Sequence, residues 1–397
     1  MDERPVRIAM IVGEESGDRL GAGLIDALAK SLPDADFFGV GGQQMRARGV
    51  ESLFPISDIA VMGISAVVAR LPMIYRRIRQ TVRHVVERKP DMLIIIDSPG
   101  FTHSVARRVA GKLPDLPVVN YVSPSVWAWK SWRAKQMTRY VDHVLALLPF
   151  EPAAHQRLGG PPCTYVGHPL IENQDLLESS GEDRSQVKDP PTLLVLPGSR
   201  RSEIDRLAAP FGEAVAMIVK EHPGMEVILP AVDHLAGQLE NVTAGWPVRP
   251  RIVTGETEKF AAFRRADAAL AASGTVTLEL ALAQVPMVVA YRVEWLGRRF
   301  KFLLKIPSIV LANLIIEENV VPEFLDEDSD PRTLADHVLR LLRPGSERNR
   351  QLAGFRTLQE KMSLPEGVAP SDKAAGIVVE VLRRPKSRRQ RRLESGT

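Results

Sequence analysis

The feature that most constrains the fold is a repeated alternation of short apolar runs with longer amphipathic stretches. The first run, residues 7–13 (RIAMIVG), is apolar along most of its length, which is typical of a central strand in a parallel sheet that is buried on both faces. A stretch with leucines at helical spacing, Leu20, Leu24 and Leu28, follows it. Because the same order recurs along most of the chain, we expect an α/β protein with parallel sheets.

The alternation occurs twice, once on each side of a polar stretch at residues 172–191. The predicted strands are residues 36–40, 92–97, 118–122 and 143–148 before it, and residues 193–196, 225–230, 250–254, 268–272 and 286–291 after it. We therefore expect two doubly wound, Rossmann-like domains, residues 1–171 and 192–365, that face each other across a cleft. Residues 172–191 are the expected linker, and residues 385–397 are expected to be a disordered basic tail.

The distribution of charge along the sequence limits the kinds of partner that we expect. The 397 residues carry +4 in total, but residues 70–89 and residues 383–397 carry +6 each, so the remainder carries −8. An acidic body with two basic patches points to a local anionic surface, either lipid headgroups or nucleic acid. The basic tail has no aromatic residue on which a base can stack, so we expect no nucleic-acid partner.

The sequence also predicts the compartment. No apolar run approaches the roughly 18–20 residues of a membrane-spanning helix, and the strand pattern begins too early for a signal or transit peptide. The single cysteine, Cys163, excludes an internal disulfide and fits a reducing cytosol. No histidine pair has metal-ligand spacing and no DxD triplet ends a predicted strand, so we expect neither a metal ion nor a cofactor.

Polar loops follow the predicted strands of the first half, where ligands of parallel sheets bind. Asp97 ends a strand of five apolar residues, and a carboxylate at that edge suits a general base; the alternative is an Asx turn or helix cap. Residues 13–18 (GEESGD) join a strand to a helix, with helix capping by Ser16 or Asp18 as the alternative. This loop is neither the GxGxxG motif of dinucleotide binding nor a Walker loop, which disfavours a nicotinamide-dependent dehydrogenase.

Two loops of the second half have the form of phosphate-binding turns. Residues 196–200 (LPGSR) and residues 273–275 (SGT) each join a strand to the N-terminus of a helix, which can hold a diphosphate. Arg200 can add positive charge there. Glu279, about one turn into the second helix, can accept hydrogen bonds from both hydroxyls of a ribose. A purely structural turn is the alternative for each loop.

Taken together, these loops resemble one family. The segments that carry the resemblance are residues 13–18 (GEESGD), 40–42 (VGG), 61–64 (VMGI), 97–99 (DSP), 121–129 (YVSPSVWAW), 149–151 (PFE), 166–169 (VGHP), 196–200 (LPGSR), 272–275 (ASGT), 286–292 (PMVVAYR) and 321–323 (VPE). In this order, from about residue 7 to residue 345, the chain resembles the lipid-A-disaccharide synthases, which are glycosyltransferases of the GT-B type. The YVSPSVWAW string is the most specific segment.

The resemblance implies an inverting glycosyltransferase that joins UDP-2,3-diacylglucosamine to 2,3-diacylglucosamine 1-phosphate, giving the β(1→6)-linked disaccharide 1-phosphate of lipid A biosynthesis and UDP. The family's catalytic aspartate matches Asp97. The implied acceptor-binding residues are Glu14, Ser16, Asp18 and Ser123, and the implied donor-binding residues are Gly198, Ser199, Arg200, Ser273, Gly274, Thr275, Glu279, Arg292 and Asn313. The family usually has a second aspartate and an asparagine where this chain has Gly100 and Thr102, so the second carboxylate of the pattern is missing.

The resemblance also bears on the membrane. Residues 72–90 predict a basic helix with an apolar stripe, and residues 61–68 before it are unusually apolar for a connection. Either the stripe packs on the sheet, or the helix lies on an anionic bilayer; the acylated substrates favour peripheral association with the cytoplasmic face of the inner membrane. Of Trp127, Trp129 and Trp132, we expect two to be packed inside the protein.

Further expectations concern the assembly and the alternatives. The resemblance allows a homodimer and predicts that a helix at residues 366–384 packs back on the first domain. The alternative enzymes are another UDP-sugar transferase or a UDP-sugar 2-epimerase on the same fold. The alternative outside catalysis is a nucleotide- or lipid-binding scaffold.

Overall fold

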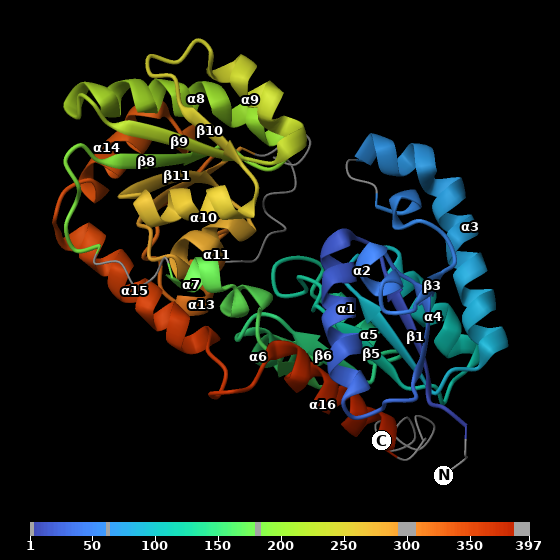
Figure 1. The fold of residues 1–397 in the computed structure, drawn as a ribbon. Coiled ribbons are helices and arrows are strands. Elements are labelled where there is room, and N and C mark those ends of the chain that lie inside the picture. The colour runs from blue at the N-terminus through green and yellow to red at the C-terminus, as the bar shows by residue number, and fades with distance from the viewer. Residues whose placement is uncertain (1–3, 61–63, 179–183, 293–306, 385–397) are drawn as a thin grey trace. The chain divides into compact units, whose positions relative to one another are not determined.

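The computed structural model describes residues 4–60, 64–178, 184–292 and 307–384, with the backbone alone for residues 64–69. The chain forms two compact units (Figure 1). Unit 1 comprises Met1–Pro169 and Leu364–Thr397, and unit 2 comprises Leu170–Ser363. Unit 2 is therefore inserted into the sequence of unit 1.

Unit 1 contains a parallel sheet of seven strands in the order β3-β2-β1-β4-β5-β6-β7. The strands are β1 (Arg7–Val12), β2 (Asp36–Val40), β3 (Glu51–Ser52), β4 (Met92–Ile96), β5 (Val118–Tyr121), β6 (His143–Ala146) and β7 (Cys163–Tyr165). The helices are α1 (Glu15–Ala29), α2 (Gln43–Arg46), α3 (Ile64–Arg88), α4 (Thr102–Lys112), α5 (Trp132–Met137), α6 (Glu151–Arg157) and α16 (Pro370–Arg383), with a 3-10 turn at Ile56–Asp58. The central strands β1 and β4 pair in register, Ile11 with Ile95 and Val12 with Ile96.

The apolar runs are continuous because the sheet has a core on each face. Ala9 and Ile11 of β1 point into one core, with Val82 of α3 and Val105 of α4. Their neighbours in β1 point into the other core, with Leu24 of α1 and Val378 of α16. Alternate residues of a strand face opposite sides of a sheet, so a strand covered on both sides is apolar at every position.

The last helix, α16, returns to unit 1 and packs against α1 (Figure 1). Its residues Ala374, Val378 and Val381 are buried in the same core as the inner face of α1. Lys30 of α1 forms an ion pair of 2.6 Å with Asp372 of α16. The C-terminal helix therefore completes one face of the unit 1 sheet.

Unit 2 contains a parallel sheet of six strands in the order β10-β9-β8-β11-β12-β13. The strands are β8 (Thr192–Leu196), β9 (Glu226–Ala231), β10 (Arg251–Thr254), β11 (Ala268–Ala272), β12 (Met287–Tyr291) and β13 (Glu323–Leu325). The helices are α7 (Gln174–Glu178), α8 (Arg201–Glu221), α9 (Ala236–Thr243), α10 (Glu256–Arg265), α11 (Thr275–Leu282), α13 (Leu311–Ile316), α14 (Pro331–Leu341) and α15 (Ser346–Met362), with 3-10 turns at Pro169–Glu172, Asp233–Leu235 and Asp326–Asp328.

The segment expected as a linker, residues 172–191, belongs to unit 2. Leu176 is fully buried, and the buried Arg184 guanidinium donates hydrogen bonds to the carbonyl groups of Phe263 and Ala266. Arg348 Nε in turn donates to Arg184 O at 2.7 Å. The described part of this segment is thus packed on unit 2, although its composition resembles that of a solvated connection.

Helix α3 begins at Ile64, eight residues before the predicted start at Pro72. Proline favours the first turn of a helix, but here it stands inside one. Ile78, Val82 and Val85 are buried in the core of unit 1, so the apolar stripe packs on the sheet. The apolar residues 61–63, the side chains of residues 64–69 and the basic tail 385–397 lie outside the part of the chain that the structure describes.

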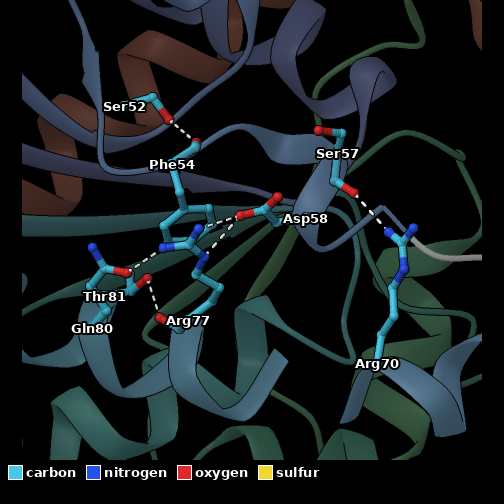
Figure 2. Close-up of polar contacts among 8 residues, drawn as sticks. All are labelled: Ser52, Phe54, Ser57, Asp58, Arg70, Arg77, Gln80 and Thr81. Atoms are coloured by element: carbon cyan, nitrogen blue, oxygen red, sulfur yellow. Dashed lines mark hydrogen bonds and ion pairs between the residues drawn. The ribbon is translucent and has the colours of Figure 1, made fainter. Parts of the chain in front are cut away.

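Polar contacts fix α3 to the segment that precedes it (Figure 2). Arg77 Nε donates to Asp58 Oδ2 at 2.9 Å, and the Arg77 guanidinium lies 4.6 Å from the centre of the Phe54 ring. About two turns earlier, Arg70 donates to Ser57 O at 3.3 Å. Arg88, at the end of the helix, pairs with Asp36 at 2.9 Å. Three of the arginines in this basic segment therefore have partners within the protein, while Arg79 on the same helix is exposed.

Candidate active site

Asp97 lies directly after β4, in a turn with an unusual backbone. Both Asp97 (φ 53°) and Ser98 (φ 44°) are in the left-handed region, which costs free energy for residues other than glycine. Asp97 Oδ1 accepts a 2.6 Å hydrogen bond from Ser98 N, and Asp97 N donates to Tyr121 O of the adjacent strand. The carboxyl group is half-buried, and none of the ion pairs between described residues involves it.

Thr102 supports this turn from the first residue of α4. Its hydroxyl is fully buried and lies 2.6 Å from Asp97 O and 3.1 Å from Ser98 O. Gly100 is the other residue that differs from the family pattern, and its position is open. A Cβ added there would meet no atom within 4 Å. The threonine that replaces the family's asparagine thus holds the backbone of the candidate catalytic residue, a role that the residue pattern does not reveal.

The loop that begins α1 lies against the Asp97 turn. A Cβ at Gly13 would stand 2.2 Å from Ser98 Cβ, so only glycine permits this approach. Ser16 Oγ donates to Asp97 Oδ2 at 3.2 Å. Glu14 occupies the N-cap position of α1 and is half-buried. The structure therefore brings Ser16 and Asp97 together, as expected from their places after neighbouring strands, and Glu14 lies two residues before Ser16.

Asp18 does not join this group. It is 4% exposed, its Oδ1 accepts hydrogen bonds from Gly42 N (2.7 Å) and Met45 N (3.2 Å), and its Oδ2 accepts one from Gln44 N (2.8 Å). The carboxylate therefore caps the N-terminus of α2. Because the side chain is buried and holds the backbone of α2, we withdraw Asp18 from the acceptor-binding set.

Ser123 is also buried, within a polar cluster formed by the loop after β5 and by α6. Ser123 Oγ lies 2.9 Å from His155 Nε2 and is 7% exposed as a residue. Glu151 Oε1 accepts a hydrogen bond from Trp127 Nε1 (3.2 Å), and Oε2 accepts one from Leu148 N (3.0 Å). The hydroxyl of Ser123 is thus held inside the protein, and we withdraw it as an acceptor contact. We call Ser123, Trp127, Glu151 and His155 the Glu151 cluster.

Burial shifts the pKa values of two residues in the Glu151 cluster. Desolvation raises the pKa of Glu151 to about 7, against hydrogen bonds from Leu148, Trp127 and Ser123 that lower it. The pKa of His155 is lowered by burial, which favours the neutral imidazole. The cluster fixes the loop of the YVSPSVWAW string beside β4, since β5 pairs with β4.

The three tryptophans of this region differ in exposure. Trp127 packs edge-on against Phe150, with ring centres 5.1 Å apart. Trp129 and Trp132 are 42% and 59% exposed, and Lys130 Nζ lies over the Trp129 ring. The prediction that two of the three are packed inside the protein is therefore wrong: one is packed and two face solvent.

A cavity of about 520 Å³ opens in unit 2 at the carboxyl ends of β8, β9 and β11. Its described lining is Leu196, Gly198, Ser199, Arg200, Glu203, Pro230, Ala231, Val232, Asp233, Gly255, Glu256, Lys259, Ala272, Ser273, Gly274, Thr275, Val276 and Glu279. Seven of the nine expected donor-binding residues are in this set. The cavity is where the topology of an open parallel sheet places a ligand.

The two helix ends in the cavity differ. At α8, Glu203 Oε2 accepts a hydrogen bond from Ser199 N (3.0 Å) and Oε1 pairs with Arg200 (2.7 Å), so an internal carboxylate occupies this end. Gly198 (φ 129°) makes room for it, because a Cβ there would lie 2.5 Å from Glu203 Cβ. At α11, a Cβ on Gly274 would meet no atom within 4 Å, so this helix end is open.

Glu279 lies in the cavity and forms an ion pair that the sequence did not indicate. Lys259 Nζ is 3.1 Å from both carboxylate oxygens. The Ser273 hydroxyl donates to Ile309 O at 2.9 Å, which anchors the turn before α11. Lys259 sits on α10, 20 residues earlier in the chain, and no motif marks it.

Arg292 and Asn313 are absent from the described lining of the cavity. The Arg292 guanidinium donates to the hydroxyl and carbonyl oxygens of Ser329 at 3.0 and 3.1 Å. The Asn313 amide is 2% exposed; its Nδ2 donates to Val321 O (2.9 Å), and its Oδ1 accepts from Val320 N and Val321 N. Both side chains are used to hold loops together, and we withdraw them from the donor-binding set.

Comparison with known proteins shows the family of the chain. The family model described as lipid-A-disaccharide synthetase matches residues 8–373. The chain belongs to this family. It is similar to the lipid-A-disaccharide synthases of Nitrobacter winogradskyi (53% identity over 96% of this chain and 97% of the relative) and Nitrobacter hamburgensis (54% identity over 95% and 96%). Members of this family are glycosyltransferases of lipid A biosynthesis, and the enzymatic prediction is confirmed.

Solved structures confirm the GT-B fold class. The chain is similar to MurG of Acinetobacter baumannii, with a TM-score of 0.54 and 14% identity over 95% of this chain and 100% of that one. It is also similar to the UDP-GlcNAc 2-epimerase of Neisseria meningitidis bound to UDP-GlcNAc, with a TM-score of 0.59 and 12% identity over 95% and 99%. Likeness at this identity shows the fold alone, so the epimerase alternative is not favoured over the family match.

Two features are absent from the described residues. No helix there is long and apolar enough to cross a membrane. No group of three or more histidine, cysteine, aspartate or glutamate side chains there is arranged to hold a metal ion.

Proposed function

We propose that Asp97 is the general base in the transfer of a diacylglucosamine unit from UDP to diacylglucosamine 1-phosphate. Asp97 removes the proton from the primary hydroxyl of the acceptor, and that oxygen attacks the anomeric carbon of the donor. The bond from this carbon to the diphosphate breaks, UDP leaves, and the configuration at the anomeric carbon is inverted. The observation that carries the proposal is the half-buried Asp97 carboxylate, fixed by Ser16 and Ser98 at the end of a central strand.

The donor is proposed to bind in the cavity of unit 2. The open N-terminus of α11 at Gly274 and Thr275 presents backbone N–H groups that suit a diphosphate. Arg200 lines the same cavity and can interact with the diphosphate when it exchanges its partner Glu203. Glu279 is proposed to accept hydrogen bonds from the ribose hydroxyls. These protein groups supply positive potential without a metal ion, so activity is expected to persist in EDTA.

The test is a product assay with the purified protein, UDP-2,3-diacylglucosamine and 2,3-diacylglucosamine 1-phosphate, in buffer with and without EDTA. Mass spectrometry is expected to show a tetra-acylated disaccharide phosphate together with UDP in both buffers. A single altered UDP-sugar instead of the disaccharide contradicts the proposed reaction. Disaccharide that forms only after Mg²⁺ is added contradicts the proposed metal-independent binding of the diphosphate.

We also propose peripheral association with an anionic membrane surface through α3. Leu71, Tyr75, Arg79 and Arg83 follow one another at four-residue spacing, and all four are exposed. Leu71 and Tyr75 are 51% and 53% exposed, which is unusual for large apolar side chains. An exposed helix face with apolar groups at one end and arginines at the other suits the boundary of an anionic bilayer. Such an association gives access to acylated substrates on the cytoplasmic face of the inner membrane.

A further inference from the structure

Lys259 and Glu279 form an ion pair in the unit 2 cavity in which the ammonium group contacts both carboxylate oxygens. The Lys259 ammonium is 3.1 Å from Glu279 Oε1 and 3.1 Å from Oε2, and both residues line the cavity. Their side chains are 23% and 15% exposed. The pair joins α10 to α11, two helices whose N-terminal ends face the same space. The pair therefore belongs to the cavity wall rather than to the outer surface.

The lysine is itself held in place. Its ammonium lies 4.6 Å from the centre of the Phe260 ring, and Phe260 is 1% exposed and packs edge-on against Phe263. A cation above an aromatic face is attracted by the negative charge density of the ring. Lys259 is held by the Phe260 ring and contacts both oxygens of Glu279. These contacts restrict rotation of the Glu279 carboxylate.

The geometry leaves capacity on Glu279 for a ligand. Each oxygen of an ionised carboxylate has two lone pairs, and Lys259 uses one on each oxygen. One acceptor position per oxygen is left, and two neighbouring acceptors match the two neighbouring hydroxyls of a ribose. A carboxylate that rotated would offer both positions only part of the time.

The excess of acidic side chains in the cavity lining gives Lys259 a second role, which is to neutralise Glu279. The described lining carries the four acidic side chains Glu203, Asp233, Glu256 and Glu279, but only the two basic side chains Arg200 and Lys259. A nucleoside diphosphate is an anion, so an uncompensated carboxylate beside it would be repulsive. A lysine paired with Glu279 lets a carboxylate serve as hydrogen-bond acceptor close to the diphosphate.

We propose that Lys259 is a positioning residue of the donor site, which orients and neutralises Glu279 so that the carboxylate accepts hydrogen bonds from both ribose hydroxyls of the nucleotide. The proposal rests on the proposed function, in which Glu279 binds the ribose. It adds a residue from α10 to a site that the sequence assigned to the turns before α8 and α11 and to Glu279.

The experiment compares the binding of UDP and of 2′,3′-dideoxy-UDP, which lacks both hydroxyls, by isothermal titration calorimetry. For Lys259→Met, the affinity for UDP is expected to fall roughly tenfold or more, because the hydrogen bonds from the ribose hydroxyls to the charged carboxylate are weakened. The affinity for the dideoxy nucleotide is expected to fall clearly less, because this nucleotide meets the same unneutralised carboxylate but has no hydrogen bonds from ribose hydroxyls to lose. Lys259→Arg is expected to restore most of the discrimination, and the donor KM of Lys259→Met is expected to rise with kcat little changed.

Controls separate the possible failures. Lys188→Met, which removes an exposed lysine of unit 2 outside the cavity lining, is expected to bind both nucleotides as the unmodified protein does. Equal losses of both nucleotides in Lys259→Met would show that the lysine acts on the diphosphate and would overturn the inference. Unchanged discrimination in Lys259→Met would also overturn it, while the ribose assignment of Glu279 stands.

Two further outcomes are informative. If the unmodified protein binds both nucleotides equally well, the ribose assignment itself fails, and the inference fails with it. If Lys259→Met does not fold, as judged by circular dichroism, Lys259→Gln takes its place with the same expected results, since it also removes the charge but keeps a polar side chain.

Discussion

Ser16 Oγ, at the start of α1, donates a 3.2 Å hydrogen bond to Asp97 Oδ2, at the end of β4. The two residues are 81 positions apart in the chain, and the contact exists because β1 and β4 are adjacent in the sheet. Glycine at position 13 allows the loop to approach, since a Cβ on Gly13 would overlap with Ser98. The candidate base is thus oriented by a neighbouring loop.

The first prediction concerns Asp97. Asp97→Asn removes the proton acceptor but keeps the size of the side chain, so kcat is expected to fall by roughly 10²–10⁴-fold, the usual contribution of a general base. The measurement is the rate of UDP release with both substrates at saturation. The urea-unfolding midpoint serves as control and is expected to change little. A variant with nearly normal kcat would refute the role assigned to Asp97.

The second prediction concerns Ser16. Ser16→Ala removes one hydrogen bond to the carboxylate, and kcat is expected to fall about tenfold, which corresponds to about 1.4 kcal/mol in the barrier. The loss is expected to be smaller than that of Asp97→Asn, and the double variant is expected to be no slower than Asp97→Asn alone, since Ser16 acts through Asp97. Kinetics of the four proteins test this; independent, multiplicative losses would mean that Ser16 has a separate role.

The third prediction distinguishes a structural asparagine from a ligand-binding one. Asn313→Ala deletes a buried amide whose hydrogen bonds hold Val320 and Val321, leaving those backbone groups without partners. The free energy of unfolding is expected to fall by about 2–4 kcal/mol. Urea denaturation measures this loss, and UDP titration of the folded variant is expected to give an unchanged Kd. Weakened UDP binding at unchanged stability would restore Asn313 to the donor site.

These residues show what the sequence predicts well and what it does not. The long apolar runs identify the central strands because burial on both faces leaves a direct signature, and the loops after them contain Asp97, Ser16 and most of the cavity lining. The short edge strands β3, β7 and β13 have two or three residues each, too few for a pattern.

The four residues that we withdrew from the proposed binding sites have a feature in common. Asp18, Ser123, Arg292 and Asn313 are polar residues in the predicted loops, but each one forms hydrogen bonds with other groups of the protein. A one-dimensional pattern cannot tell a carboxylate or amide that faces a ligand from one that caps a backbone turn. Lys259 and Glu151 were missed for the converse reason, because their partners come from another element of the fold.

The fourth prediction is a pH dependence of stability. Burial raises the pKa of Glu151 to about 7 from 4.5, so the folded protein binds this proton more tightly than the unfolded chain does. The resulting stabilisation is fully present below pH 4.5 and is lost as the pH rises through about 7. Relative to Glu151→Gln, which does not titrate, the unmodified protein is expected to lose up to about 3 kcal/mol between pH 4.5 and pH 8.

Urea denaturation of the two proteins at several pH values measures this difference. Because other titrating groups are common to both proteins, their contributions cancel in the comparison. The groups around Glu151 include Trp127, Ser123, Cys163 and the backbone at Leu147 and Leu148. His155, whose pKa is lowered by burial, is bonded to Ser123. A difference that is independent of pH would contradict the raised pKa.

The fifth prediction concerns α3 and the membrane. Replacing the exposed Arg76, Arg79 and Arg83 by glutamine is expected to weaken binding to phosphatidylglycerol vesicles roughly 100-fold, because each basic residue near an anionic surface contributes about 1 kcal/mol. Vesicle sedimentation measures the effect, and phosphatidylcholine vesicles are the control lipid.

A matched variant on the same helix tests the specificity of this result. Arg77 is paired with Asp58 and lies over Phe54 (Figure 2). Arg77→Gln is therefore expected to lower the unfolding midpoint and to leave vesicle binding of the folded protein nearly unchanged. If Arg77→Gln and the triple variant weaken vesicle binding equally, the exposed face of α3 is not the contact surface.

The return of α16 to unit 1 affects the order in which the protein can fold during synthesis. The inner face of α1, including Leu24 and Leu28, shares its core with α16, which is the last described element to leave the ribosome. Unit 2 is one continuous stretch of chain, so it can fold while unit 1 still lacks a helix. A chain interrupted before residue 370 would leave that apolar face uncovered, which makes the incomplete product a natural substrate for chaperones and proteases.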